Sequence, residues 1–72
     1  MSTMKYAVSY EQGETTWGAS VPDLGVFAVA DTLDEVRHMV AEAVEFHIES
    51  LKDLGFPVPP PTTVAEYVEV AA

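Results

Sequence analysis

Cysteine is absent from this chain of 72 residues. A disulfide scaffold, a CxxC redox centre and any site where a thiolate binds a metal are therefore excluded. Long apolar runs are absent as well, because stretches such as Val26–Ala30 fall far short of the ~20 residues that cross a bilayer. Residues 1–5 lead directly into a strand-like pattern, without the apolar region of a signal peptide. Together these absences favour a soluble cytoplasmic protein.

Positive charge is scarce in the sequence. Lys5, Arg37 and Lys52 oppose twelve Asp and Glu residues, which leaves a net charge of −9. Direct binding of nucleic acid and adsorption to anionic membranes are disfavoured, because both depend on cationic side chains. A basic protein is the partner that such a chain attracts over long range. Solubility is the simpler explanation for an arbitrary acidic domain, so the charge by itself assigns no function.

The chain is also short, and we expect a single domain over residues 1–72. Its hydrophobic fraction of 49% indicates a globular rather than a disordered chain. A core of this size contributes only ~3–5 kcal/mol of stability unless disulfides, metals or self-association add to it. Because we expect neither disulfides nor a metal, we predict a homo-oligomer, either a dimer or a tetramer.

Alternating apolar residues predict three strands in the first half of the chain. Strands are expected over residues 4–12 and 15–21, which a turn joins into an antiparallel hairpin. Pro22 and Gly25 end this pattern. A third strand is expected over residues 26–30, and its almost wholly apolar sequence predicts burial on both faces.

A helix predicted over residues 32–54 is the clearest element. Thr32 followed by Glu35 fits a capping box, which satisfies free amide groups of the first turn. Gly55 suits the position after the last turn, since glycine adopts positive φ without a steric penalty. One side of the predicted helix is apolar and comprises Leu33, Val36, Val40, Ala43, Val44, His47, Leu51 and Leu54.

The residues after the helix predict a connector and a fourth strand. Proline-rich residues 57–61 favour a stiff extended connector. The β-branched and aromatic side chains of residues 64–70 favour a strand. The resulting order β-β-β-α-β predicts an α+β two-layer sandwich, with a mostly antiparallel sheet and one long helix on one face. Nothing in the sequence covers the other face of the sheet, so we expect another copy to cover it.

The side of the helix opposite the apolar side is acidic. Its candidate partner-binding residues, termed the acidic ridge below, are Glu35, Glu42, Glu45, Phe46, Glu49 and Asp53. Carboxylates at this spacing repel one another, and too few cations lie nearby to neutralise them. The ridge is either a docking surface for a cationic partner or an ordinary solvated face, and the residues alone favour the solvated face. Phe46 flanks the carboxylates and is the better aromatic candidate for an interface.

No set of residues predicts catalysis or a metal site. His38 and His47 are nine positions apart and about half a turn out of phase, so they cannot bind one ion together. His47 lies within the apolar side, where a neutral core imidazole is the default interpretation, ahead of a metal or pH-switch role. Asp23 and Asp31, the candidates for a divalent-metal nuclease, flank the third strand at opposite ends. We therefore expect no enzyme activity, no cofactor and no metal.

Five segments occur in a characteristic order, namely KYAV (5–8), WGASVPDL (17–24), ADTLDEV (30–36), AEAVEFHIESL (41–51) and LGFPVPPP (54–61). Together they resemble the HicB-like antitoxin family over about residues 4–70. The resemblance implies a partial, degraded ribonuclease-H-like fold without a working active site. It also implies an antitoxin that occludes a small basic HicA-like toxin, which cleaves mRNA by means of a histidine.

Two departures limit what the resemblance implies. Complete members carry a C-terminal DNA-binding module, which we expect to be missing because the sequence ends at Ala72. The family's Pro-Gly-Cys motif is replaced by Gly25, Val26 and Phe27, which shortens the loop before the third strand. The alternative hypothesis is an orphan oligomeric binding module for a small ligand or another protein, and a metal-dependent nuclease stands third.

Overall fold

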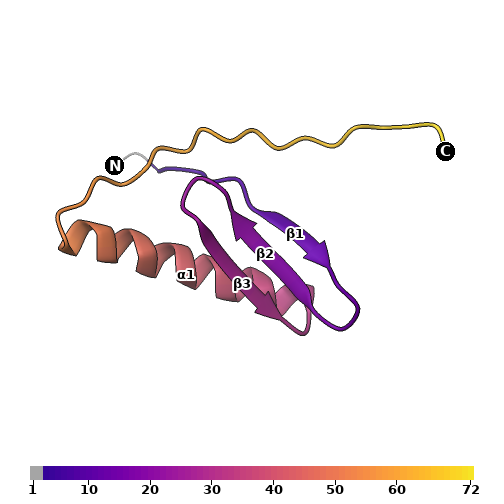
Figure 1. The fold of residues 1–72 in the computed structure, drawn as a ribbon, viewed down its shortest axis with the longest axis horizontal. Coiled ribbons are helices and arrows are strands. Elements are labelled where there is room, and N and C mark those ends of the chain that lie inside the picture. The colour runs from indigo at the N-terminus through magenta and orange to yellow at the C-terminus, as the bar shows by residue number, and fades with distance from the viewer. Residues whose placement is uncertain (1–2) are drawn as a thin grey trace.

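Three strands and one helix form two layers in the computed structural model, which describes residues 3–72 (Figure 1). β1 (Ser9–Gln12), β2 (Trp17–Val21) and β3 (Val26–Ala30) form an antiparallel sheet in the order β1-β2-β3. α1 (Leu33–Asp53) packs against one face of this sheet. The predicted α+β arrangement of antiparallel strands and one long helix is confirmed.

A small apolar core lies between the sheet and α1. The register places Ala19 of β2 opposite Ala28 of β3, and these short side chains let α1 approach the sheet closely. Val36 of α1 fills the space and is 0% exposed, so its burial contributes roughly 1.5–3 kcal/mol. The buried residues of the core are Ala19, Val21, Leu24, Ala28, Val36 and Val40.

Specific capping groups fix both ends of α1. At its start the Thr32 hydroxyl oxygen accepts a hydrogen bond from the Glu35 amide at 3.1 Å, as the capping box predicts. At its end Gly55 adopts φ +76°, its amide donates to the Lys52 carbonyl at 3.1 Å, and the Phe56 amide donates to the Leu51 carbonyl at 2.9 Å. This pair of hydrogen bonds is a Schellman motif, which satisfies carbonyl groups that the last turn leaves free.

The first two strands are shorter than their sequence pattern predicts. β1 begins at Ser9 rather than at residue 4, and β2 begins at Trp17 rather than at residue 15. Ser9 pairs with Ser20, one residue before β2 ends. Upstream of Ser9 a single residue of β2, Val21, remains before the turn that starts at Pro22, so the ladder cannot continue to residue 4.

The predicted fourth strand is not formed within the chain. Residues 64–70 have no regular secondary structure, and Val64, Tyr67, Val68 and Val70 are at least 77% exposed. The segment leaves the two-layer body instead of lying beside one of its strands (Figure 1), so its backbone has no strand to pair with. Residues 57–61 form an irregular connector, in agreement with their proline content.

The prediction that β3 is buried on both faces is wrong. Ala28 is buried on the helix side, whereas Phe27 and Val29 point to the other side and are 68% and 45% exposed. Only one layer covers the sheet in the single chain, so alternate residues of β3 stay open to solvent. Leu54, which was assigned to the apolar side of the helix, is 69% exposed because it caps the end of α1 beyond the sheet.

Candidate functional site

The acidic ridge runs along the solvent side of α1. All six of its residues are exposed, and Phe46 has an exposed fraction of 73%. The structure brings four of them together around a shallow depression, namely Glu42, Glu45, Phe46 and Glu49. Glu35 lies in the first turn of α1 and Asp53 is its last residue, so neither of them lines the depression.

Met39 also lines this depression and is absent from the sequence-based prediction. Its side chain is 46% exposed, and it stands seven residues before Phe46, which places both on the same side of the helix two turns apart. The heptad spacing from Phe46 was the signal that could have identified it. Two apolar side chains surrounded by carboxylates suit a partner that carries long cationic side chains, because Lys and Arg combine an apolar stem with a charged end.

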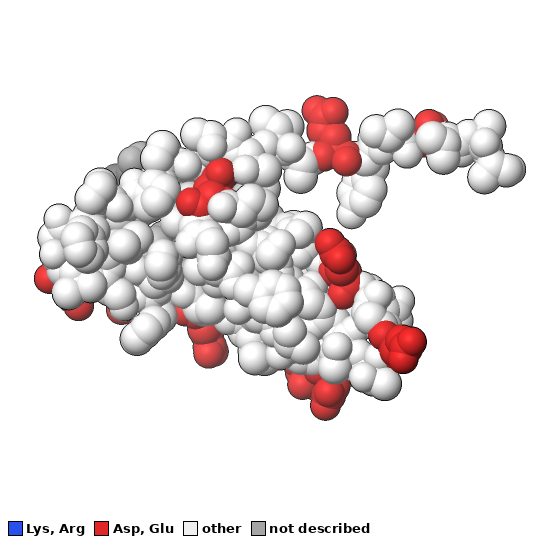
Figure 2. All heavy atoms as spheres, viewed as in Figure 1, with Lys and Arg blue, Asp and Glu red and all other residues white. Residues whose placement is uncertain are grey.

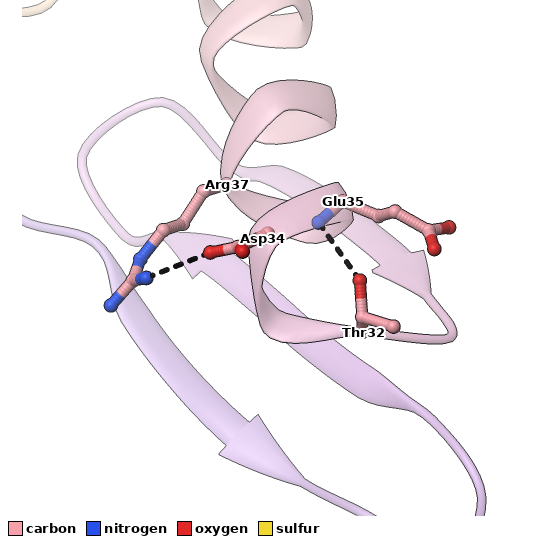
Figure 3. Close-up of polar contacts among 4 residues, drawn as sticks. All are labelled: Thr32, Asp34, Glu35 and Arg37. Carbon is pink, nitrogen blue, oxygen red and sulfur yellow. Dashed lines mark hydrogen bonds and ion pairs between the residues drawn. The ribbon is translucent and has the colours of Figure 1, made fainter.

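The carboxylates of the acidic ridge form no ion pair with a cation of the described residues 3–72. The ion pair found within residues 3–72 joins the Arg37 guanidinium to the Asp34 carboxylate at 3.3 Å (Figure 3). The Arg37 guanidinium also lies 5.9 Å from the ring centre of Tyr10, so it turns toward the sheet. Glu42, Glu45 and Glu49 therefore present their full negative charge to solvent.

The sheet face opposite α1 differs from the ridge in its chemistry. It holds a second hollow, in which the exposed Phe27 ring lies over Gly18: a Cβ atom at Gly18 would come within 3.6 Å of that ring. The Ser9 and Ser20 hydroxyls lie 2.9 Å apart across β1 and β2. In the view of Figure 2, most carboxylates appear at the rim of the body and on the C-terminal extension, one lies within the outline at the upper left, and no Lys or Arg is visible.

Asp23, one of the two candidates for a metal-dependent nuclease, holds the chain after α1 in place. One carboxylate oxygen accepts hydrogen bonds from the amides of Thr62 and Thr63, both at 3.0 Å. The other oxygen accepts from their hydroxyls at 3.1 and 2.7 Å. These bonds, above all that from the Thr63 amide, hold the pKa of Asp23 below its usual value of 3.8.

This anchor was not predicted, because its partners lie 39 and 40 positions apart in the sequence. Its local signal is an aspartate in a turn and a pair of threonines after a proline-rich connector. Asp31, the other nuclease candidate, follows β3 at the opposite end of the sheet, as predicted. The structure therefore does not bring the two carboxylates together.

The histidines lie in different surroundings. His38 is exposed on α1, and His47 is half-buried at the edge of the apolar side. Within residues 3–72 no three His, Cys, Asp or Glu side chains are arranged to hold a metal ion. In the same part of the chain, no helix combines the length and apolar composition needed to cross a bilayer.

Comparison with known proteins provides the context for these surfaces. A family model described as "HicB_like antitoxin of bacterial toxin-antitoxin system" matches residues 6–71. An uncharacterized 14.9 kDa protein from the rep-hol intergenic region of Haemophilus phage HP1 (strain HP1c1) is 32% identical over 66 residues. The match covers 90% of this chain and 50% of that relative, so the chain spans about half the length of the curated relative. No solved structure matches the chain.

Proposed function

Because the chain belongs to the HicB-like antitoxin family of bacterial toxin–antitoxin systems, we propose that it neutralises a basic HicA-like ribonuclease by covering the surface with which that toxin binds mRNA. The observation that carries this proposal is the exposed acidic ridge, with two apolar side chains, Met39 and Phe46, beside its carboxylates. The protein acts by binding and not by catalysis.

Electrostatics supports competition with RNA. A ribonuclease that binds mRNA does so through cationic side chains, which attract the phosphate backbone. A chain with a net charge of −9 and a row of unneutralised carboxylates on one helix attracts the same cationic surface. Binding of the ridge and binding of RNA are then mutually exclusive, and the toxin is blocked without any chemical step.

Met39 and Phe46 supply the part of the interface that is insensitive to salt. Exposed aromatic side chains at the centre of a contact commonly carry most of the binding energy, while charged residues at the rim steer the approach. Phe46 is 73% exposed and Met39 is 46% exposed in the single chain, so a partner gains from covering them. The carboxylates of Glu42, Glu45 and Glu49 surround them and select for a cationic partner.

We propose that the working form is a homo-oligomer, which binds no nucleic acid directly and uses no cofactor. Because such a toxin cleaves mRNA, its antitoxin must act in the cytoplasm, where the mRNA lies. A dimer or tetramer would present two or more acidic ridges, which raises the apparent affinity for a toxin that itself assembles.

Reversal of charge on the ridge tests this function. The double variant Glu42→Lys, Glu49→Lys raises the net charge by four and removes the carboxylates on either side of Phe46. Co-expressed with a small basic protein encoded beside it, the native chain should restore growth, and the variant should fail to do so. In a purified complex we expect the dissociation constant to rise about tenfold or more at low salt.

A matched control separates the ridge from the overall charge. The double variant Glu14→Lys, Asp31→Lys changes the net charge by the same amount at exposed positions outside α1 and outside residues 64–70. It should retain most of the binding and the rescue of growth. Equal loss in both variants would reject the ridge as the contact surface. A complex that survives charge reversal on the ridge would also reject the ridge as the contact surface. Failure of the native chain to bind any such toxin would favour a binding module with another partner.

A further inference from the structure

We propose that residues 64–70, termed the C-terminal arm, form a strand along the outer edge of β1 in a second copy of this chain, and that the second copy returns its own arm in the same way. This contact lies apart from the acidic ridge. The inference concerns how two copies assemble, and it can fail while the proposed binding of a toxin stands.

The C-terminal arm has the composition of a strand but no strand beside it. Val64, Val68 and Val70 share one side of the arm with Glu66, and Ala65 and Tyr67 share the other side with Glu69. Tyr67 is fully exposed, and the three valines are at least 77% exposed. A segment with this many exposed apolar side chains gains from pairing its backbone and covering them, and nothing within residues 3–72 does so.

A complementary edge exists at β1. This strand pairs with β2 on one side alone, and all four of its residues are exposed. Residues 5–8 continue the same alternating pattern upstream without any strand beside them. Residues 5–12 therefore form an extended edge of about 27 Å, which matches the roughly 23 Å of a seven-residue arm.

The arm is held so that it does not cover its own β1. The Tyr6 hydroxyl donates to the Pro59 carbonyl at 2.6 Å, and Asp23 binds Thr62 and Thr63, so the connector crosses the end of the sheet before the arm begins. From there the arm leaves the body on the β1 side and diverges from that strand (Figure 1). A two-fold symmetric partner whose β1 faces this side can receive the arm and return its own.

The shape and charge of the chain agree with such an exchange. Its radius of gyration is 14.1 Å, whereas a compact chain of this length has one of roughly 11 Å. If the valines of the arm lie on the same side as Tyr6, Val8 and Tyr10, then Glu69 shares the opposite side with Lys5. Lys5, one of three Lys and Arg residues in the chain, thus lies on the edge where Glu69 would dock, whereas Glu66 would share the side of the valines.

Removal of the arm tests whether it joins two copies. A chain that ends at Thr63 keeps Asp23 with both of its threonine partners and every residue of the buried core. Light scattering coupled to size exclusion should give twice 7.8 kDa for the full chain and the mass of one copy for the shortened chain. A monomeric full chain, or a shortened chain that still dimerises, would overturn the proposal.

Cysteine cross-linking tests where the arm binds. The chain has no native cysteine, so each disulfide that forms joins the introduced residues. A tagged Val68→Cys chain is mixed with an untagged chain that carries Val8→Cys or Tyr10→Cys, which share one side of the β1 edge. At least one pair should give a mixed disulfide dimer, whereas Val68→Cys with Val29→Cys on β3 should not. A single chain that carries Val68→Cys together with Val8→Cys or Tyr10→Cys tests the alternative that the arm pairs with its own β1. A monomer closed by an internal disulfide would mean that the arm folds back on its own edge.

Discussion

At the scale of single residues, the carboxylate of Asp23 has the densest set of hydrogen bonds among the described side chains. Both oxygens accept two bonds each, and all four donors belong to Thr62 and Thr63. Hydrogen bonds of this kind favour the ionised form, so they lower the pKa of Asp23, led by the bond from the Thr63 amide. The anchor and the ionisation state of Asp23 are therefore linked.

The sign of this linkage gives a prediction about pH. Because the pKa is lowered in the folded chain, the anchor is complete above the usual value of 3.8 and is lost as the pH falls through the lower folded value. In ¹H–¹⁵N spectra, the amide shifts of Thr62 and Thr63 should titrate together with a midpoint below 3.8. A midpoint at or above that value would contradict the geometry.

At neutral pH, Asp23→Asn should reproduce the loss of the anchor. An amide side chain is uncharged and offers one acceptor oxygen in place of two, so it cannot accept from all four donors and its remaining bonds are weaker. Hydrogen exchange at Thr62 and Thr63 should become several-fold faster. Asp31→Asn is the matched control, because Asp31 accepts no side-chain hydrogen bond from either threonine, and it should leave their exchange rates unchanged.

At the scale of elements, α1 carries both the core and the acidic ridge. Its buried side holds Val36 and Val40 against the sheet, while the opposite side presents Glu42 and Glu49 to solvent. The exposed carboxylates repel one another along the helix, so they do not stabilise it. The helix depends on its core contacts and on its capping groups.

Removal of the N-terminal cap should therefore cost measurable stability. Thr32→Ala deletes the hydroxyl that accepts the Glu35 amide, which lowers the free energy of unfolding by about 1 kcal/mol. For a domain of this size the midpoint of thermal unfolding falls by roughly 4–8 °C, measured by circular dichroism at fixed protein concentration. Thr32→Ser should restore most of the loss, and Thr15→Ala at an exposed position should change little. A Thr32→Ala chain as stable as the native one would show that the cap is dispensable.

Elements defined by neighbouring residues were predicted well from the sequence. The hairpin of β1 and β2 and the capped helix depend on alternation and on Thr32 and Gly55, which are visible locally. The strand expected over residues 64–70 was not found, because a strand needs a neighbour and the single chain offers none there. The prediction that Phe27 is buried failed for a related reason, since its face of the sheet has no second layer.

The candidate site was predictable to a similar extent. Helical periodicity is enough to place Glu42, Phe46 and Glu49 on one side of α1. Met39 was missed because it lies between the acidic and the apolar sides, where its heptad spacing from Phe46 is the signal that marks it. The contact of Asp23 with Thr62 depends on how the whole chain folds back, which no local pattern encodes.

At the scale of the whole molecule, the two layers present different surfaces to solvent. Carboxylates occupy the solvent side of α1, and the sheet face opposite it carries the exposed Phe27 and Val29. Two copies that each carry a net charge of −9 repel one another, so the proposed self-association needs contacts that offset that cost. A cationic partner is instead attracted by the same charge.

Salt should therefore move the two associations in opposite directions. Affinity for a cationic toxin should fall as sodium chloride rises, because the Debye length shrinks from about 10 Å at 0.1 M to about 3 Å at 1 M. Self-association should strengthen or stay constant, since salt screens the repulsion between copies. Titration calorimetry of the complex and sedimentation of the free chain at several salt concentrations measure both. A toxin complex indifferent to salt would contradict electrostatic recognition.

The anchor at Asp23 also sets an order of events during synthesis. Pairs within the sheet join residues at most 13 positions apart, such as Trp17 with Ala30, whereas Asp23 meets Thr62 across 39 positions and Tyr6 meets Pro59 across 53. Short loops close fastest, and the threonines leave the ribosome after the strands and most of α1. We therefore expect the hairpins and the helix to form before the anchor closes, so that residues 62 and 63 bind to Asp23 after the two layers have packed.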